Sequence, residues 1–339
     1  MVTVLYTFDR QFMWKTFAAI DTHLVDETAV LWLGADDAAD ADDVITADQP
    51  ASAHQPVESA AALDAAVAEI GPDVVVKNHR FESTRLDDDP TYHERYPVVH
   101  VRHGASLGRG ETVNTTRDLA DAVAVALAPG DRWADRYRAA FPESVRVVTV
   151  GIPEADALVG TDSPRERRVL YAPTNHNYGG GCYVETAETV LETFADTDFR
   201  LRFRPHPMDR VEEPGQSVTE RCRDRIAGIP NVTFDDAATP RESLLWADLL
   251  LSDCSGVVTE WLHTGRPLVQ LTATAADHEL PTVGLQTDDL SLSAVERVYE
   301  EGYPPAVARA VDETVADLGI PMDGRAGARA AREVMACTQ

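Results

Sequence analysis

Lysine is almost absent from this sequence: only Lys15 and Lys77 occur, so arginine supplies nearly all of the positive charge. Acidic residues are in large excess, with 57 Asp and Glu against 30 Lys and Arg, and the formal net charge is −27 at pH 7. In molar salt the Debye length falls to about 3 Å, so self-repulsion of such a surface is screened. We infer a salt-adapted protein from a halophilic, haloarchaeal source. The missing basic face also argues against a nucleic-acid partner.

Cysteine and long apolar runs are scarce as well. The 4 cysteines show no C-x-x-C spacing, which argues against a disulfide framework or a zinc ribbon. No apolar run reaches the roughly 18 residues that a membrane span needs. The first residues, 1–7, are apolar but are followed by Asp9 and Arg10, without signal-peptide architecture. We therefore expect a soluble, cytoplasmic protein with no bound metal.

Two common nucleotide-binding fingerprints are also missing. Neither half of the chain carries G-x-G-x-x-G after its first expected strand, and the G-x-x-x-x-G-K-[ST] loop does not occur. The first absence argues against an ordinary NAD-binding site, and the second against a P-loop NTPase.

Short apolar runs instead alternate with helical stretches along the whole chain, which is typical of parallel α/β sheets. Strands are predicted at 2–6, 29–33, 73–77, 98–102, 123–128 and 145–150, and again at 168–172, 200–204, 231–234, 248–252 and 267–271. The polar stretch 161–168 reads as a linker. The sequence thus predicts an α/β protein with two Rossmann-like doubly wound domains, 1–160 on the acceptor side and 161–323 on the nucleotide-donor side, facing across a cleft. A C-terminal helix, 324–339, could pack back on the N-terminal domain.

A turn of small residues follows the expected strand 248–252. Ser252, Asp253, Ser255 and Gly256 lead directly into a helix, where free N–H groups and the helix dipole can hold a phosphate. Glu260 lies about one turn further along and could face a ribose. Alternatively, Asp253 or Ser255 is only an N-cap of the helix.

Histidines follow two other expected strands. His206 lies between two prolines, which fix the direction of its imidazole, and Arg204 two residues earlier could meet a diphosphate. His103 precedes a glycine at the end of strand 98–102, where it can take a proton from a hydroxyl near neutral pH. His100, three residues earlier, points to the opposite face and is expected to be buried. Thr174 follows strand 168–172 and should border the same cleft.

Taken in order, these segments resemble the CDP-glycerol glycerophosphotransferase family, the teichoic-acid-type polymerases and primases with a GT-B fold. The matching segments lie within 98–271 and read His103-Gly104, Gly151-Ile152-Pro153, Leu170-Tyr171-Ala172-Pro173-Thr174, Arg204-Pro205-His206-Pro207, and the 248–260 block followed by Gly265-Arg266-Pro267. They occur in the order that the family shows.

The resemblance implies transfer of glycerol-phosphate, or another polyol-phosphate, from a CDP-activated donor to a hydroxyl of a cell-surface glycan or lipid-linked precursor. It implies that His103 is the base that deprotonates the acceptor and that His206 contacts the donor diphosphate. The turn from Ser252 to Gly256 would hold the donor's phosphates. The nucleotide-activated donor would be a substrate and no cofactor is implied. An acceptor of this kind would bring the protein to the inner face of the membrane as a peripheral protein.

Two other functions stay open. One is a GT-B enzyme acting on a UDP-sugar, either a glycosyltransferase or a relative of the hydrolysing UDP-N-acetylglucosamine 2-epimerases. Those epimerases share a Ser-Gly turn with a following glutamate, as in Ser255, Gly256 and Glu260, although the arginine of their next segment is missing after residue 271. The other is a catalytically silent GT-B domain that only binds a nucleotide.

Overall fold

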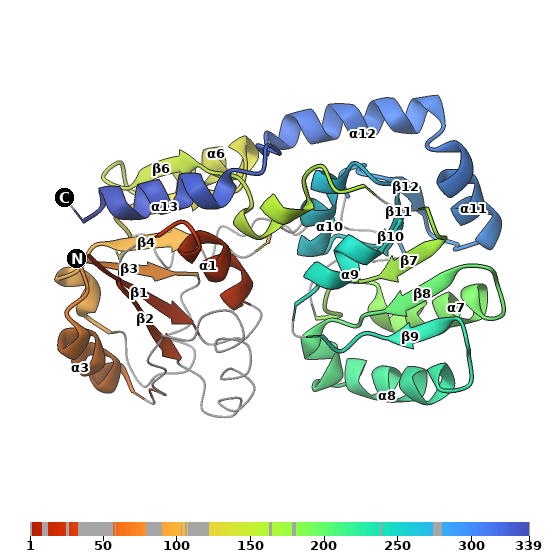
Figure 1. The fold of residues 1–339 in the computed structure, drawn as a ribbon, viewed down its shortest axis with the longest axis horizontal. Coiled ribbons are helices and arrows are strands. Elements are labelled where there is room, and N and C mark those ends of the chain that lie inside the picture. Colours follow the sequence, from red (N-terminus) through yellow and green to blue (C-terminus); the bar gives the residue numbers. More distant parts are fainter. Residues whose placement is uncertain are drawn as a thin grey trace. The chain divides into compact units, whose positions relative to one another are not determined.

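The computed structural model describes residues 2–8, 13–24, 27–32, 57, 59–78, 90–102, 104–105, 107, 122–162, 165–177, 181–237, 239–273 and 280–338. The chain divides into two compact units (Figure 1). Unit 1 comprises Met1–His103, Glu111–Ala157 and Leu318–Gln339, and unit 2 comprises Gly104–Gly110 and Leu158–Asp317. Each unit is built on one six-stranded sheet.

The sheet of unit 1 is entirely parallel and has the order β2-β1-β3-β4-β5-β6. All six strands that the sequence predicts in this half are present. Their bounds are β1 Thr3–Phe8, β2 Glu27–Trp32, β3 Val74–Lys77, β4 Val98–Val101, β5 Val125–Ala128 and β6 Arg146–Thr149.

The helices of unit 1 are α1 (Trp14–Asp21), α3 (Ala60–Ile70), α6 (Asp131–Ala140) and, from the C-terminus, α13 (Ala326–Ala336). Short 3-10 helices cover Tyr92–Glu94 and Pro153–Leu158. α3 begins after Ser59, whose side chain accepts a hydrogen bond from the Ala62 N–H, and ends at Gly71 in the left-handed conformation. An aromatic cluster of Tyr6, Phe8, Trp14 and Phe17 packs β1 against α1.

The C-terminal helix α13 packs within unit 1. The backbone N–H groups of Ala326 and Gly327 donate to the carboxylate of Asp156. Gly327 is pressed so closely on α1 that an added Cβ would lie 2.5 Å from the Ala19 carbonyl oxygen. Glycine is therefore needed for the approach of the two helices.

The sheet of unit 2 is also parallel, in the order β12-β11-β10-β7-β8-β9. Its strands are β7 Arg168–Tyr171, β8 Arg200–Phe203, β9 Val232–Phe234, β10 Leu249–Ser252, β11 Leu268–Leu271 and β12 Leu285–Thr287. The first five were predicted, and β12 was missed. The strand order reverses at β7, between β10 and β8, and ligands of open α/β sheets bind at such a reversal, outside the carboxyl ends of the strands.

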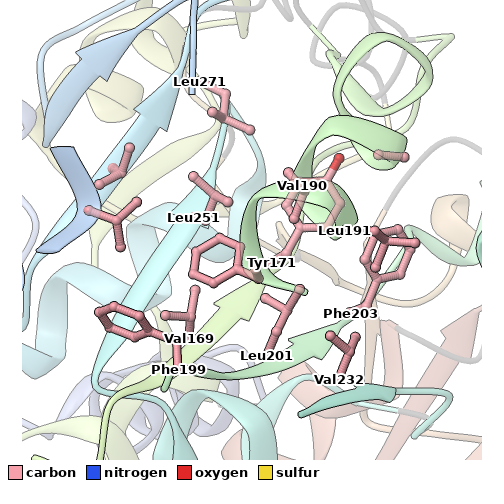
Figure 2. Packing of buried hydrophobic residues seen from close by; sticks show 14 of the residues in the cluster. Val169, Tyr171, Val190, Leu191, Phe199, Leu201, Phe203, Val232, Leu251 and Leu271 are labelled. Carbon is pink, nitrogen blue, oxygen red and sulfur yellow. The ribbon is translucent and has the colours of Figure 1, made fainter. Parts of the chain in front are cut away.

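The α-helices described in unit 2 and its C-terminal extension are α7 Tyr183–Phe194, α8 Gly215–Ile226, α9 Arg241–Trp246, α10 Gly256–Trp261, α11 Leu292–Glu301 and α12 Pro305–Leu318. Two 3-10 helices, η4 (Pro207–Arg210) and η5 (Leu262–Thr264), lie among them. Alternate strand residues such as Val169, Leu201 and Leu251 pack with α7, α8 and α11 in one core (Figure 2). The other face buries Leu170 and Leu250 with residues of α9 and α10. No helix in the described ranges is long and apolar enough to cross a membrane.

Candidate site at the carboxyl ends of the unit 2 strands

The turn after β10 is organised around the carboxylate of Asp253, which is completely buried. Its oxygens accept hydrogen bonds from the backbone N–H groups of Thr174, at 2.9 and 3.1 Å, Cys182, at 3.1 Å, and Ser255, at 3.0 Å. Burial raises the pKa of Asp253, and the hydrogen bonds from Cys182, Thr174 and Ser255 act in the opposite direction. Asp253 therefore joins the loop after β7 to the turn after β10, and direct contact with a phosphate would place two anions together.

The serines of this turn have different positions. The Ser252 hydroxyl is buried and donates to the carbonyl of Ala172 at 2.6 Å, so it ties β10 to the end of β7. Ser255 is the N-cap of α10, and its side chain accepts a hydrogen bond from the Val257 N–H. The structure thus bears out the N-cap alternative for Ser255.

Gly256 and Glu260 occupy α10 itself. A Cβ on Gly256 would lie 3.5 Å from the Cα of Gly104, and the Leu107 N–H donates to the Cys254 carbonyl at 3.0 Å, so the segment after β4 lies against the first turn of α10. Glu260 is buried, with 2% of its surface exposed, so it faces the protein interior.

His206 lies at the start of η4, directly after β8, and is half-buried. Its Nδ1 accepts a hydrogen bond from the Met208 N–H at 3.2 Å. A nitrogen that accepts a backbone N–H carries no proton, so in the neutral ring the proton is on Nε2. The local backbone therefore fixes His206 as a hydrogen-bond donor at Nε2, which suits an anionic ligand.

Arg204, which was predicted to meet a diphosphate, has hydrogen-bond partners within the protein. Its guanidinium is buried and donates to Asp235 Oδ1 at 2.9 Å and to the Ala237 carbonyl at 2.8 Å. Arg210 also contacts the loop after β9. It donates to the carbonyls of Pro205 and Asp235, and burial lowers its pKa to about 10. Both arginines thus hold the loop after β9, because Asp235 supplies the charge that compensates for their burial.

Two other predicted residues remain. Thr174 is buried and engages Asp253 through its backbone N–H, so it belongs to the same turn. His103, the expected base, lies outside the described residues. Within the described ranges, no group of three or more His, Cys, Asp and Glu side chains could hold a metal ion.

A buried pair that the sequence analysis did not include lies beside His206. The imidazole Nδ1 of His176, in the loop after β7, contacts Asp209 Oδ1 in η4, and the His176 backbone N–H donates to the same oxygen at 3.3 Å. Burial raises the pKa of Asp209, and the hydrogen bonds from His176 oppose this. The sequence signal was a histidine two residues beyond Thr174, but its partner lies 33 positions away.

Comparison with known proteins gives the fold its name. No protein-family model and no curated protein matches the sequence. Among solved structures, a UDP-GlcNAc 2-epimerase from Neisseria meningitidis bound to UDP-GlcNAc matches 99% of this chain and 100% of its own length, with TM-score 0.64 and 14% identity. The wall teichoic acid polymerase TagF matches 99% of this chain and 89% of its own, with TM-score 0.64 and 14% identity. S. aureus MnaA in complex with UDP matches at TM-score 0.64 and 14% identity, over 97% and 94% of the two chains.

The chain has a GT-B fold. The prediction of two Rossmann-like doubly wound domains is thereby confirmed. In this GT-B protein the loops after β10, β7, β8 and β9 are joined in that spatial order through Asp253, Asp209 and Asp235. The polar groups at the reversal of strand order are therefore held in place before any ligand binds, which is the arrangement that electrostatic stabilisation of a ligand requires.

Proposed function

We propose that this chain is a CDP-glycerol glycerophosphotransferase-like enzyme, which transfers a polyol-phosphate from a CDP-activated donor to a hydroxyl of a cell-surface glycan or lipid-linked precursor. The proposal assigns it to the synthesis of cell-envelope polysaccharide, at the cytoplasmic side of the membrane. It includes no cofactor and no metal, because the nucleotide-activated donor is itself the substrate.

One observation carries the proposal: Gly104, the residue after His103, packs on Gly256 at the first turn of α10. The two short motifs that carry the family resemblance, His103-Gly104 and the Ser255-Gly256 turn, therefore meet through their glycines. An added Cβ at either position would lie 3.5 Å from the Cα of the other residue, an ordinary van der Waals contact, and Gly104 has the left-handed conformation (φ 59°) that favours glycine. This contact supports a site in which His103 acts near a phosphate held by that turn.

The donor's negative charge would be held without a free arginine from the strand ends, since Arg204 and Arg210 are engaged by the loop after β9. The N–H groups of Ser255 and Val257 are engaged by Asp253 and by the Ser255 side chain, so in our proposal the Gly256 N–H and the Nε2–H of His206 take that role. In-line displacement at phosphorus depends mainly on positioning and charge stabilisation, and such preformed donors supply both. His103 would accept the proton of the attacking hydroxyl.

The neighbours in fold are consistent with a nucleotide-activated donor. TagF is a wall teichoic acid polymerase, and one TagF structure was determined with CDPG. The titles of two other neighbours include UDP-GlcNAc and UDP. All three ligands are nucleotide diphosphates or their conjugates, and we propose the same class for this protein.

The test is to incubate the full chain in molar KCl with CDP-glycerol, CDP-ribitol and several UDP-sugars and to measure the released nucleotide. We expect CMP from a CDP-polyol, and we expect His206→Ala to lower its rate about 10²–10⁴-fold, the range for loss of a positioned proton donor. His23→Ala, an exposed histidine after α1, is the matched control and should keep the wild-type rate. CMP release that persists unchanged in His206→Ala would remove the role of His206.

A second candidate is an enzyme acting on a UDP-sugar. It is favoured by the match of the epimerase fold over 100% of that chain and by the Ser255-Gly256 turn with Glu260. UDP or a converted sugar in the same assay would support it. Stabilisation by a nucleotide without any turnover would indicate a silent nucleotide-binding domain.

A further inference from the structure

His176 and Asp209 form a carboxylate–imidazole pair that no part of the proposed reaction uses. The Asp209 side chain is completely buried, and 8% of the His176 side chain is exposed. The Asp209 Oδ1 atom contacts Nδ1 of the ring and also accepts the His176 backbone N–H. An ionised carboxylate oxygen can only accept hydrogen bonds, so opposite Asp209 the neutral His176 ring carries its proton on Nδ1 and a lone pair on Nε2.

The Nε2 atom of His176 is buried and has no hydrogen-bond partner among the residues that the structure describes. A buried polar atom without a partner is a cost to the stability of the fold, and such atoms are rare in folded proteins. A ligand group that donates a hydrogen bond at this point would remove the cost. The lone pair of His176 is thus a site for a donor such as a hydroxyl.

The pair is held rigidly by its surroundings. Asp209 packs on Gly215 so closely that a Cβ there would lie 2.4 Å from Oδ1. The Thr219 hydroxyl donates to the Asp209 carbonyl at 2.8 Å, and the Asp209 N–H donates to the carbonyl of His206 at 2.9 Å. η4 therefore fixes His206 and the acceptor of His176 together.

The two histidines consequently have opposite tautomers. His206 accepts at Nδ1 and donates at Nε2, whereas His176 donates at Nδ1 and accepts at Nε2. A carboxylate that orients an imidazole is the arrangement by which enzymes position a general base.

We infer that His176, oriented by Asp209, is a catalytic proton acceptor of this site. The inference rests on the proposed function. The attacking hydroxyl gives its proton to His176 Nε2 while its oxygen forms the new bond to phosphorus. The bond from phosphorus to the nucleotide's bridging oxygen breaks with its electron pair, and the nucleoside monophosphate leaves with that oxygen hydrogen-bonded to His206 Nε2–H. In this inference His176 replaces His103 as the base, while the donor, the leaving group and the role of His206 stay as in the proposed function.

The test compares the pH dependence of kcat for wild type, His176→Asn and His103→Ala. Asparagine can keep the hydrogen bond to Asp209 but lacks an acceptor at the position of Nε2. We expect kcat to fall about 10²–10⁴-fold and its acidic limb to disappear in His176→Asn. Asp209→Asn should lower kcat as well, because an amide can also hydrogen-bond the other tautomer. Glu212 and Tyr183 interact electrostatically with Asp209, and the same profile is recorded for Glu212→Gln to identify any limb that it causes.

Asn177→Ser is the matched control, since Asn177 is exposed in the same loop and bonds Glu212 through its side chain amide. It should keep the wild-type profile. If His176→Asn keeps both kcat and the acidic limb while His103→Ala loses them, the inference is wrong.

A second measurement separates this inference from the proposed function. In protein labelled with ¹⁵N-histidine, the His176 signals, identified by their loss in His176→Asn, should show the Nδ1–H tautomer, and Nε2 should shift when CDP-glycerol is added. If the wild-type protein turns over no donor, the proposed function fails. The response of the His176 Nε2 signal to the nucleotide conjugates then tests the role of His176 by itself. An Nε2–H tautomer, or a signal that no CDP- or UDP-conjugate shifts, overturns the role of His176.

Discussion

Unit 1 and unit 2 contain parallel sheets of the same size, but they bury ionisable side chains in different places. In unit 2, Asp209, Asp235 and Asp253 follow the strands β8, β9 and β10 and accept hydrogen bonds from neighbouring loops. In unit 1, His100 is buried within β4 itself, with its ring 5.7 Å from that of Tyr137.

The buried carboxylates of unit 2 and the buried His100 of unit 1 have different roles. The carboxylates of unit 2 fix loops at the edge of the sheet where a ligand is expected, so their burial serves the geometry of a site. His100 packs in a hydrophobic environment, and desolvation together with the charge of Arg102 lowers its pKa to about 3, so it is a neutral part of the core. The comparison predicts that substitution of these carboxylates of unit 2 affects both stability and ligand binding, whereas substitution of His100 affects stability alone.

The largest effect is expected from Asp253→Asn. The Asp253 carboxylate accepts hydrogen bonds from three backbone N–H groups, and an amide would turn its own N–H groups toward at least one of them. The free energy of unfolding should therefore fall by about 3–5 kcal/mol, as for the loss of a buried charged partner. Thermal unfolding in molar KCl measures this. Asp236→Asn, an exposed aspartate of unit 2, is the control and should change stability by no more than about 0.5 kcal/mol. Equal effects of the two substitutions would show that Asp253 does not hold the loops.

The next effect is the response of unit 1 to acid. The unfolded chain binds a proton on His100 below its ordinary pKa of about 6.5, whereas the folded chain does so only near 3. The stability that neutral His100 contributes above pH 6.5 is therefore lost as the pH falls, by about 2 kcal/mol between pH 6.5 and 5. His100→Gln should flatten this dependence of the unfolding free energy, and His23→Gln should not. A slope that stays the same in His100→Gln contradicts the burial of a neutral imidazole.

The smallest effect compares two helix N-caps. Ser59 and Ser255 each accept a backbone N–H, at α3 and α10 respectively. Replacement by alanine should destabilise either helix by about 1 kcal/mol. Only Ser255→Ala should also weaken CDP binding, by about fivefold for one lost hydrogen bond, as measured by calorimetry. Unchanged CDP affinity in Ser255→Ala would place the phosphates away from this turn.

The period of apolar residues was enough to predict eleven of the twelve strands in the described residues, because a buried parallel strand must be apolar on both faces. Short β12 and helix α11 were missed. α11 had a readable signal in Ser291 as N-cap and in Leu292, Val295 and Val298 at helical spacing. The pairing of Arg204 with Asp235 was not predicted for another reason: a strand pattern places a side chain at a sheet edge but does not reveal which carboxylate lies beside it.

The sequence by itself determined the two α/β domains, the small-residue turn after β10 and the positions of His103 and His206 after their strands, because each follows from local periodicity and chain direction. Only the tertiary structure decided that Asp253 serves the loop after β7, that Arg204 is held by Asp235, and that His176 meets Asp209. Those pairs form because the strand order reverses at β7 and places β10 and β8 on its two sides. Local sequence patterns do not show which strands become neighbours in the sheet. The partner of a buried charged side chain is therefore known only from the assembled sheet.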